Sequence, residues 1–299
     1  MSEESKPIAV CTTDDMDEIV KEVSKGKCVL FLGAGVHHEP PEDSPYKYPE
    51  ERRPPSGRTL SRMLAQECKF NEQFPKENIT DLQRVSLCYE LKMKRVKLVR
   101  RIKEAVHEGK EPSPVLKALA QLDFPLVITT NYDQLFESAL VEAGKRPEIC
   151  IYNKDKFTET KDIMDDPDPE RPFLLKIHGD VDYGDSIVIT DEDYINFVLR
   201  MSDKEDYHPV PETFRYHLKR WTILFIGYSL MDYNLRLLFK TLYWKLDGLD
   251  KDHEDYSIDP YTDPLIVKIL AEQVSFLTQD VWKFVPELYR RIKNQEMES

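Results

Sequence analysis

The sequence predicts a doubly wound, Rossmann-like α/β fold that combines a parallel sheet with a helical insertion. Short apolar runs, each long enough for a buried strand, alternate with amphipathic stretches of helical period. Three of the apolar runs end in glycine or polar residues, namely Val29–Val36, Val127–Asp133 and Lys176–Asp180. Ligands of open parallel sheets bind beyond the carboxyl ends of the strands, so these three segments also mark the expected binding edge.

The first part of the chain predicts a helix, a strand, a long loop and then the insertion. Met16–Lys25 has helical spacing and leads into an apolar strand, Cys28–Leu32. Glu39–Gly57 holds six prolines, so we expect a loop there that could close over the binding edge as a lid. Thr59–Leu122 shows only helical spacing and is expected to be an insertion within one domain of 299 residues.

Strands and helices alternate again after the insertion, which is the pattern of a parallel sheet. The expected strands are Leu126–Thr129, Ile149–Tyr152, Phe173–Ile177, Ser186–Ile189, Trp221–Ile226 and Val274–Leu277. The expected helices are Tyr132–Ala143, Glu192–Leu199, Asp232–Leu246 and Val281–Ile292, and Pro264–Glu272 fits either a helix or a strand. The polar stretches expected to form loops are Asp155–Pro172, Lys204–Pro211 and Asp247–Pro264.

Composition excludes several classes of function. Hydrophobic residues make up 40% and charged residues 32% of the chain, as in soluble globular proteins. The net charge of −13 argues against direct binding to nucleic acid or to an anionic membrane. The polar N-terminus does not resemble a signal peptide, and the longest apolar run is far shorter than the roughly 20 residues of a membrane span. Five scattered cysteines without C-x-x-C spacing indicate no disulfides and no metal site, so we expect a cytoplasmic protein.

Gly33, Ala34 and Gly35 follow the first expected strand and form a candidate phosphate loop. A strand-to-helix turn favours residues that tolerate positive φ, and a pyrophosphate needs close approach of the backbone. The dehydrogenase pattern G-x-G-x-x-G is incomplete, because His38 stands at the third glycine position. Hydride transfer is therefore not expected, and a purely structural role for this turn remains an alternative.

Polar side chains suited to chemistry at a sugar follow two other strands. Asn131 and Asp133 come directly after Leu126–Thr129, although either could instead cap the next helix. His178 follows Phe173–Ile177 and is able to take a proton from a hydroxyl or from water. A structural histidine bonded to the backbone is the alternative. Because parallel strands end at one edge, we expect these side chains to meet beside the glycine turn.

Two further features have both a functional and a structural interpretation. Gly227-Tyr228-Ser229 follows the strand Trp221–Ile226 and could supply donors to a nucleotide or simply cap a helix. One dense basic run shares helical spacing with apolar residues; it comprises Lys92, Lys94, Arg95, Lys97, Arg100, Arg101 and Lys103. A solvated helix face is the favoured interpretation of this run, and a docking face for an acidic partner or another subunit is the alternative.

The order of these motifs resembles that of the sirtuin superfamily, which carries G-A-G, T-Q-N-x-D, H-G and G-x-S. The corresponding residues here are Gly33-Ala34-Gly35, Thr129–Asp133, His178-Gly179 and Gly227-Tyr228-Ser229. Pro55–Leu60 also looks like the family's second loop. Two residues depart from the pattern, since Thr130 replaces the glutamine and His37 replaces the serine that usually follows G-A-G-x. The zinc module is absent as well, because no cysteine follows Cys150.

The T-T-N-Y-D version and the run Asp191–Tyr194 are similar to sirtuin-like domains of bacterial anti-phage systems. That resemblance implies an NAD⁺ hydrolase that needs no metal and cleaves its substrate into nicotinamide and ADP-ribose, as the toxic effector of abortive infection. The residues implied to bind the dinucleotide are Gly33, Ala34, Gly35, Thr130, Gly227 and Ser229.

The same resemblance implies roles for three catalytic residues. Asn131 would position water or the ribose, His178 would hydrogen-bond a ribose hydroxyl and act as general base, and Asp133 would support Asn131. Gating is expected through a homo-oligomer or a separate sensor, such as a HerA-type ATPase or an Argonaute-like protein. Two alternatives remain: a zinc-free NAD-dependent deacylase or ADP-ribosyltransferase, and a non-catalytic module that binds NAD⁺ or ADP-ribose to control assembly.

Overall fold

The expected doubly wound parallel sheet is confirmed by a computed structural model, which describes residues 11–152, 167–201, 210–228, 253–270 and 272–298. Its seven strands lie in the order β3-β4-β2-β1-β5-β6-β7, and every recorded pairing is parallel. They are β1 (Cys28–Leu32), β2 (Leu126–Thr129), β3 (Glu148–Ile151), β4 (Phe173–Lys176), β5 (Thr222–Ile226), β6 (Asp255–Ile258) and β7 (Val274–Leu277). Strand order reverses beside β1, between β2 and β5, which is where such sheets open a binding crevice.

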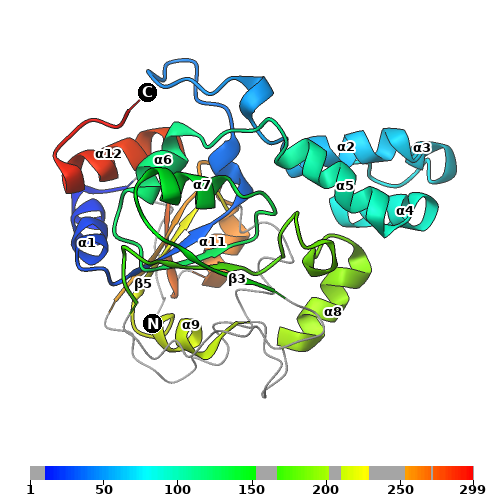
Figure 1. Cartoon of the computed structure of the whole chain (residues 1–299). Coiled ribbons are helices and arrows are strands. Elements are labelled where there is room, and N and C mark those ends of the chain that lie inside the picture. The colour runs from blue at the N-terminus through cyan, green and yellow to red at the C-terminus, as the bar shows by residue number, and fades with distance from the viewer. Residues whose placement is uncertain (1–10, 153–166, 202–209, 229–252, 271, 299) are drawn as a thin grey trace, which may run out of the picture.

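Helices cover both faces of the sheet (Figure 1). One face packs against α1 (Thr13–Ser24), α6 (Pro114–Ala120), α7 (Leu135–Glu142) and α12 (Val281–Lys293). The other packs against α8 (Asp191–Met201), α9 (Glu212–His217) and α11 (Pro264–Leu270). Successive strand residues point to opposite faces, so Leu30 joins the first core and Phe31 the second. None of the helices within the described ranges is long and apolar enough to cross a membrane.

A third group of helices stands beside the sheet, at the right of Figure 1. It contains α2 (Gly57–Glu67), α3 (Phe70–Gln73), α4 (Leu82–Met93) and α5 (Arg95–Val106), which enclose a core of their own. The last helix of the expected insertion, α6, packs instead on α7 and α12 in the layer beside the sheet. Ser113 caps α6 by accepting from the N–H of Leu116 at 3.1 Å. The division into one domain with an insertion stays a prediction.

The sequence-based prediction was wrong at two strands. Ser186–Ile189, expected as a strand, continues from the short 3-10 turn η3 (Gly184–Ser186) without joining the sheet. Its carbonyls bond to side chains instead, since Arg95 donates to Ile187 O at 2.5 Å and Tyr132 Oη to Val188 O at 2.8 Å.

The strand β6 was not predicted, because it lies inside the acidic stretch Asp247–Pro264 that was expected to be a loop. There the buried carboxylate of Asp255 accepts from the N–H of Ile223 on β5 at 2.8 Å, so its charge is hydrogen-bonded within the sheet. Tyr256 and Ile258 meanwhile enter the core. Most of the ambiguous stretch forms the helix α11, which spans Pro264–Leu270, and the helix expected at Asp232–Leu246 lies outside the described residues.

Candidate functional site

Two glycine turns cross at the carboxyl edge of β1 and β5. The N–H of Gly33 donates to Ile226 O at 2.9 Å, and that of Gly35 donates to Gly227 O at 2.8 Å. A Cβ on Gly33 would collide with Gly227 O, and one on Gly35 would lie 2.8 Å from Gly227 Cα. Glycine is therefore required here by backbone packing against backbone.

One of the two reasons predicted for the first two glycines, a positive φ, was wrong. Gly33 has φ −112°, and the only glycine of the crossing with positive φ is Gly227 at +72°. Close approach of the two turns, rather than left-handed backbone, explains Gly33 and Gly35. Ala34, which lies between these two glycines, is exposed.

Gly227→Ala is expected to lower the free energy of unfolding by about 1–3 kcal/mol, because the new Cβ would lie 2.6 Å from Val36 N. Gly109→Ala is the matched control, since Gly109 also has positive φ (+68°) but nothing within 4 Å of the added Cβ. Urea denaturation of both variants separates steric overlap from backbone strain. Equal losses in the two variants would contradict the close packing of the turns.

The structure brings Asn131, Asp133 and His37 together in one buried polar cluster. His37 ends the short 3-10 turn η1 (Ala34–His37) after the glycine turn, and its Nε2 lies 3.3 Å from Asp133 Oδ2. Asn131 Nδ2 lies 3.4 Å from the same Nε2. The three side chains therefore join the loop after β1 to the loop after β2.

Asp133 combines the two alternatives that its position suggested. Its Oδ1 accepts at 3.0 Å from the N–H of Leu135, the first residue of α7, and so satisfies a donor at the start of that helix; α7 begins at Leu135 instead of Tyr132, and Gln134 holds the N-cap position. The Oδ2 of Asp133 faces His37. Burial by itself would raise the pKa of Asp133, but His37 and Lys176 together with the Leu135 N–H hold that pKa below its usual value. The carboxylate is therefore ionised at neutral pH.

Two atoms of this cluster are buried without a protein partner among the residues that the structure describes: Asn131 Oδ1 and His37 Nδ1. Asn131 is 9% exposed and His37 is 5% exposed. Buried polar atoms in native proteins are nearly always hydrogen-bonded, so an orphaned pair on touching side chains marks a place where a polar ligand or water binds.

His178 lies at the same edge but in a different environment. Thr129 pairs with Lys176 across β2 and β4, so Asn131 and His178 both lie two residues beyond that pair. The imidazole, however, packs edge-on against the rings of Tyr194 and Phe197 from α8, with centroids 5.2 and 5.3 Å away. Burial lowers its pKa to about 3.

The structure thus does not join His178 to the cluster of His37, Asn131 and Asp133 by any contact recorded within the described ranges. Its Nε2 is nevertheless buried and lacks a partner among those same residues. His178 therefore also fits a site that a polar ligand completes.

The buried side chain of Lys176 on β4 connects the loop after β2 with the loop after β4. Its Nζ donates to Asp133 O at 2.5 Å, to Glu137 Oε1 at 2.6 Å and to Asp180 Oδ2 at 2.5 Å. These carboxylates raise the pKa of Lys176 although burial opposes them. Asp180, two residues after His178, is therefore tied through Lys176 to the loop that carries Asn131, and it helps to fix that loop in place.

Thr130 and Gly227 belong to adjoining loops. The hydroxyl of Tyr228 donates to Thr130 Oγ1 at 2.9 Å, which ties the loop after β2 to the loop after β5. Tyr228 also packs edge-on against Phe31, 5.0 Å between centroids. Ser229, the last predicted binding residue, lies outside the described residues.

Several cations of the basic run on α4 and α5 bond to this protein's own acids. Arg95 pairs with Asp193 at 2.7 Å, Arg101 with Glu67 at 2.7 Å and Lys103 with Asp182 at 2.6 Å. Asp193 belongs to the run Asp191–Tyr194. At the start of α8 it also accepts from the N–H of Thr190 at 3.0 Å. Intramolecular pairing thus accounts for part of this run.

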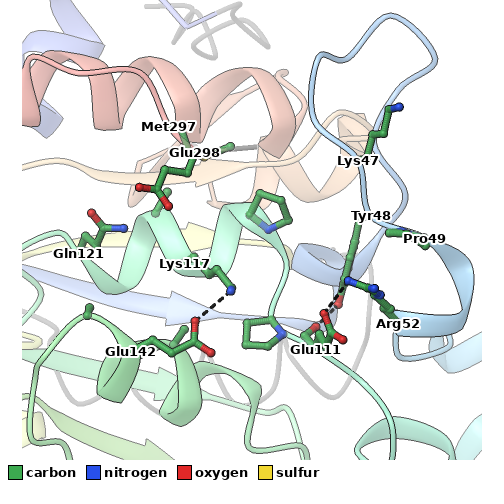
Figure 2. A pocket seen from close by; sticks show the side chains of 15 residues that line it. Lys47, Tyr48, Pro49, Arg52, Glu111, Lys117, Gln121, Glu142, Met297 and Glu298 are labelled. Carbon is green, nitrogen blue, oxygen red and sulfur yellow. Dashed lines mark hydrogen bonds and ion pairs between the residues drawn. The ribbon is translucent and has the colours of Figure 1, made fainter.

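A cavity of about 530 Å³ lies between α6, α7, the loop at Lys47–Arg52 and the C-terminal residues (Figure 2). Its lining includes none of the predicted site residues. Figure 2 shows that Lys117 pairs with Glu142 (2.9 Å) and Arg52 with Glu111 (3.0 Å), so these charges neutralise one another.

Residues 125–275 match the family model described as SIR2-like domain. "NAD(+) hydrolase ThsA" of Acinetobacter baumannii (strain 532279) is 26% identical over 294 residues, covering 93% of this chain and 55% of that protein. "Defense-associated sirtuin 2" of Bacillus subtilis is 29% identical over 168 residues, covering 54% of this chain and 15% of that protein. The chain thus spans about half the length of the first relative and a smaller part of the second.

A solved structure, from work on the "Structural Basis for the Mechanism and Regulation of Sir2 Enzymes", aligns with a TM-score of 0.46 and 15% identity. The alignment covers 95% of this chain and 99% of that one.

Proposed function

Because the chain belongs to the SIR2-like domain family, we propose that it cleaves NAD⁺ between nicotinamide and ribose, releasing nicotinamide and ADP-ribose. One observation carries the proposal: the orphaned polar atoms of Asn131 and His37 lie beside the glycine turn at the carboxyl edge of β1 and β2. The name of the Acinetobacter baumannii relative, an NAD(+) hydrolase, points to the same substrate.

The proposed chemistry assigns one task to each residue. Departure of nicotinamide leaves an oxocarbenium-like sugar, so rate depends on stabilising positive charge and placing the incoming oxygen. Asn131 orients the ribose or the attacking water, and Asp133 holds the loop that carries it. His178 hydrogen-bonds a ribose hydroxyl and takes its proton. The dinucleotide itself is bound by Gly33, Ala34, Gly35, Thr130, Gly227 and Ser229.

The proposed biological role is that of a toxic effector in anti-phage defence, which depletes NAD⁺ in the cytoplasm of an infected cell. The name of the Bacillus subtilis relative, "Defense-associated sirtuin 2", supports this setting. A gate is then needed, and we propose homo-oligomerisation or a separate sensor, of the HerA-type ATPase or Argonaute-like kind. The loop Glu39–Gly57 is the candidate lid; Trp282 Nε1 holds its start by donating to His38 O at 3.2 Å.

The test is to incubate the protein with NAD⁺, alone and with candidate partners, and to quantify both products by chromatography. We expect equal amounts of nicotinamide and ADP-ribose, at a rate that an acyl-lysine peptide does not change. Acceleration by the peptide would instead identify a deacylase or transferase. Saturable binding without turnover in any mixture would identify an assembly module.

A further inference from the structure

His37 belongs to the buried cluster with Asn131 and Asp133, but the resemblance to the sirtuin motifs implies no role for it. It stands where the sirtuin pattern has serine, and its side chain is 4% exposed. Nε2 faces the carboxylate of Asp133 at 3.3 Å, and Nδ1 is buried without a partner in the described part of the chain. The two ring nitrogens thus have different surroundings, which determines where the proton lies.

The ionised carboxylate of Asp133 accepts hydrogen bonds and donates none. Its Oδ1 already takes the N–H of Leu135, so Oδ2 is stabilised when Nε2 of His37 carries a proton. The alternative tautomer would let Asn131 Nδ2 donate to Nε2 at 3.4 Å, but it would set a lone pair against the carboxylate. The charge-assisted bond is the stronger one, so the neutral imidazole has its proton on Nε2 and a free lone pair on Nδ1.

We propose that His37, oriented by Asp133, is the general base that activates the water attacking the ribose of NAD⁺. This inference rests on the proposed function. The bond from C1′ of the ribose to nicotinamide breaks, and the electron pair leaves with the ring nitrogen, so nicotinamide departs neutral. A bond then forms between C1′ and the water oxygen, and the proton of that water passes to His37 Nδ1.

His37 suits this step better than His178 does. Its side chain contacts Asn131, and both His37 Nδ1 and Asn131 Oδ1 are buried acceptors without a partner among the described residues, so water at this end of the cluster meets two unsatisfied acceptors. His178 packs against the rings of Tyr194 and Phe197 and has no recorded contact with Asn131 or Asp133 within the described ranges. The two histidines thus accept different protons: His178 takes that of a ribose hydroxyl, and His37 takes that of the attacking water.

The first test does not depend on enzymatic activity. Long-range ¹H–¹⁵N correlation spectra of the ligand-free protein report which ring nitrogen of a histidine carries the proton, and the His37→Gln variant identifies the signals. We expect the Nε2–H tautomer for His37 in the wild type. An Nδ1–H tautomer at neutral pH would overturn the proposal, because Nδ1 would then have no lone pair to accept a proton.

The second test separates cleavage from water activation. In His37→Gln the side-chain amide still donates to Asp133, so the thermal unfolding midpoint should stay unchanged. Net hydrolysis should fall about 100-fold, the range of a lost general base. Exchange of labelled nicotinamide into NAD⁺ should persist, because that reaction needs no water. Azide, an anion that attacks C1′ without losing a proton, should restore nicotinamide release and form ADP-ribosyl azide.

The neighbouring exposed His38 provides the matched control, and His38→Gln should leave both reactions unchanged. A parallel fall of hydrolysis and exchange in His37→Gln, or unchanged hydrolysis, would contradict the role of His37. If the wild type performed neither reaction under any condition, the proposed function would fail, and the role of His37 in that reaction would fail with it.

Discussion

Replacing Asn131 with alanine is expected to reduce nicotinamide release from NAD⁺ at least about 100-fold while leaving the protein folded. The amide is the group proposed to orient the reacting ribose or water, and alanine supplies no polar atom in its place. Folding should survive because the backbone N–H of Asn131 keeps its bond to Thr129 Oγ1 at 3.0 Å. Within the part of the chain that the structure describes, the side chain loses the 3.4 Å contact with His37 and no other recorded hydrogen bond.

Asn196 provides the control for this variant. It is exposed on α8, so Asn196→Ala should retain wild-type turnover. Both variants are assayed by chromatography of nicotinamide, with circular dichroism to confirm folding. Full turnover by Asn131→Ala would show that the proposed role of this amide is wrong.

Lys176→Met is expected to have the largest effect on stability, a loss of about 3–5 kcal/mol in the free energy of unfolding. The lysine side chain is completely buried, and its removal leaves the carboxylates of Asp180 and Glu137 buried without their cation. The bond to Asp133 O is lost as well, so the loop that carries Asn131 is no longer fixed to β4. Guanidinium denaturation measures the loss.

The matched control is an ion pair at the surface. Lys117 pairs with Glu142 at 2.9 Å, but both side chains are about half exposed, at 48% and 54%. Lys117→Met should therefore cost less than about 1 kcal/mol, because water already screens this pair. A similar loss in both lysine variants would mean that the buried network does not support the site.

Two of the strands that the sequence predicted most accurately are buried along their whole length. Cys28–Leu32 and Leu126–Thr129 match the observed bounds because buried parallel strands consist of nearly continuous apolar residues, and the bounds of Val274–Leu277, where Ser275 is partly exposed, match as well. Asp255–Ile258 was missed because a charged residue opens it, and the hydrogen bond from Ile223 that accommodates this charge becomes visible in three dimensions. Ser186–Ile189 is apolar enough for a strand, but distant side chains take up its carbonyls.

The edge that carries the candidate site was predictable, whereas its internal contacts were not. Strand ends with Gly33, Asn131 and His178 identified the loops from sequence alone. His37 was noted only as a departure from a pattern, because its contact with Asp133 joins residues 96 positions apart. Lys176 offered one signal, a charge at the end of an apolar strand, but its partners become clear only in three dimensions.

The most direct test of this account is a crystal structure of the Asn131→Ala variant, slow enough to retain NAD⁺, grown with that dinucleotide. We expect the ribose next to nicotinamide to lie at the carboxyl edge of β1 and β2, within hydrogen-bonding reach of both His37 and His178. A dinucleotide bound elsewhere, for example in the cavity between α6 and α7, would contradict the account.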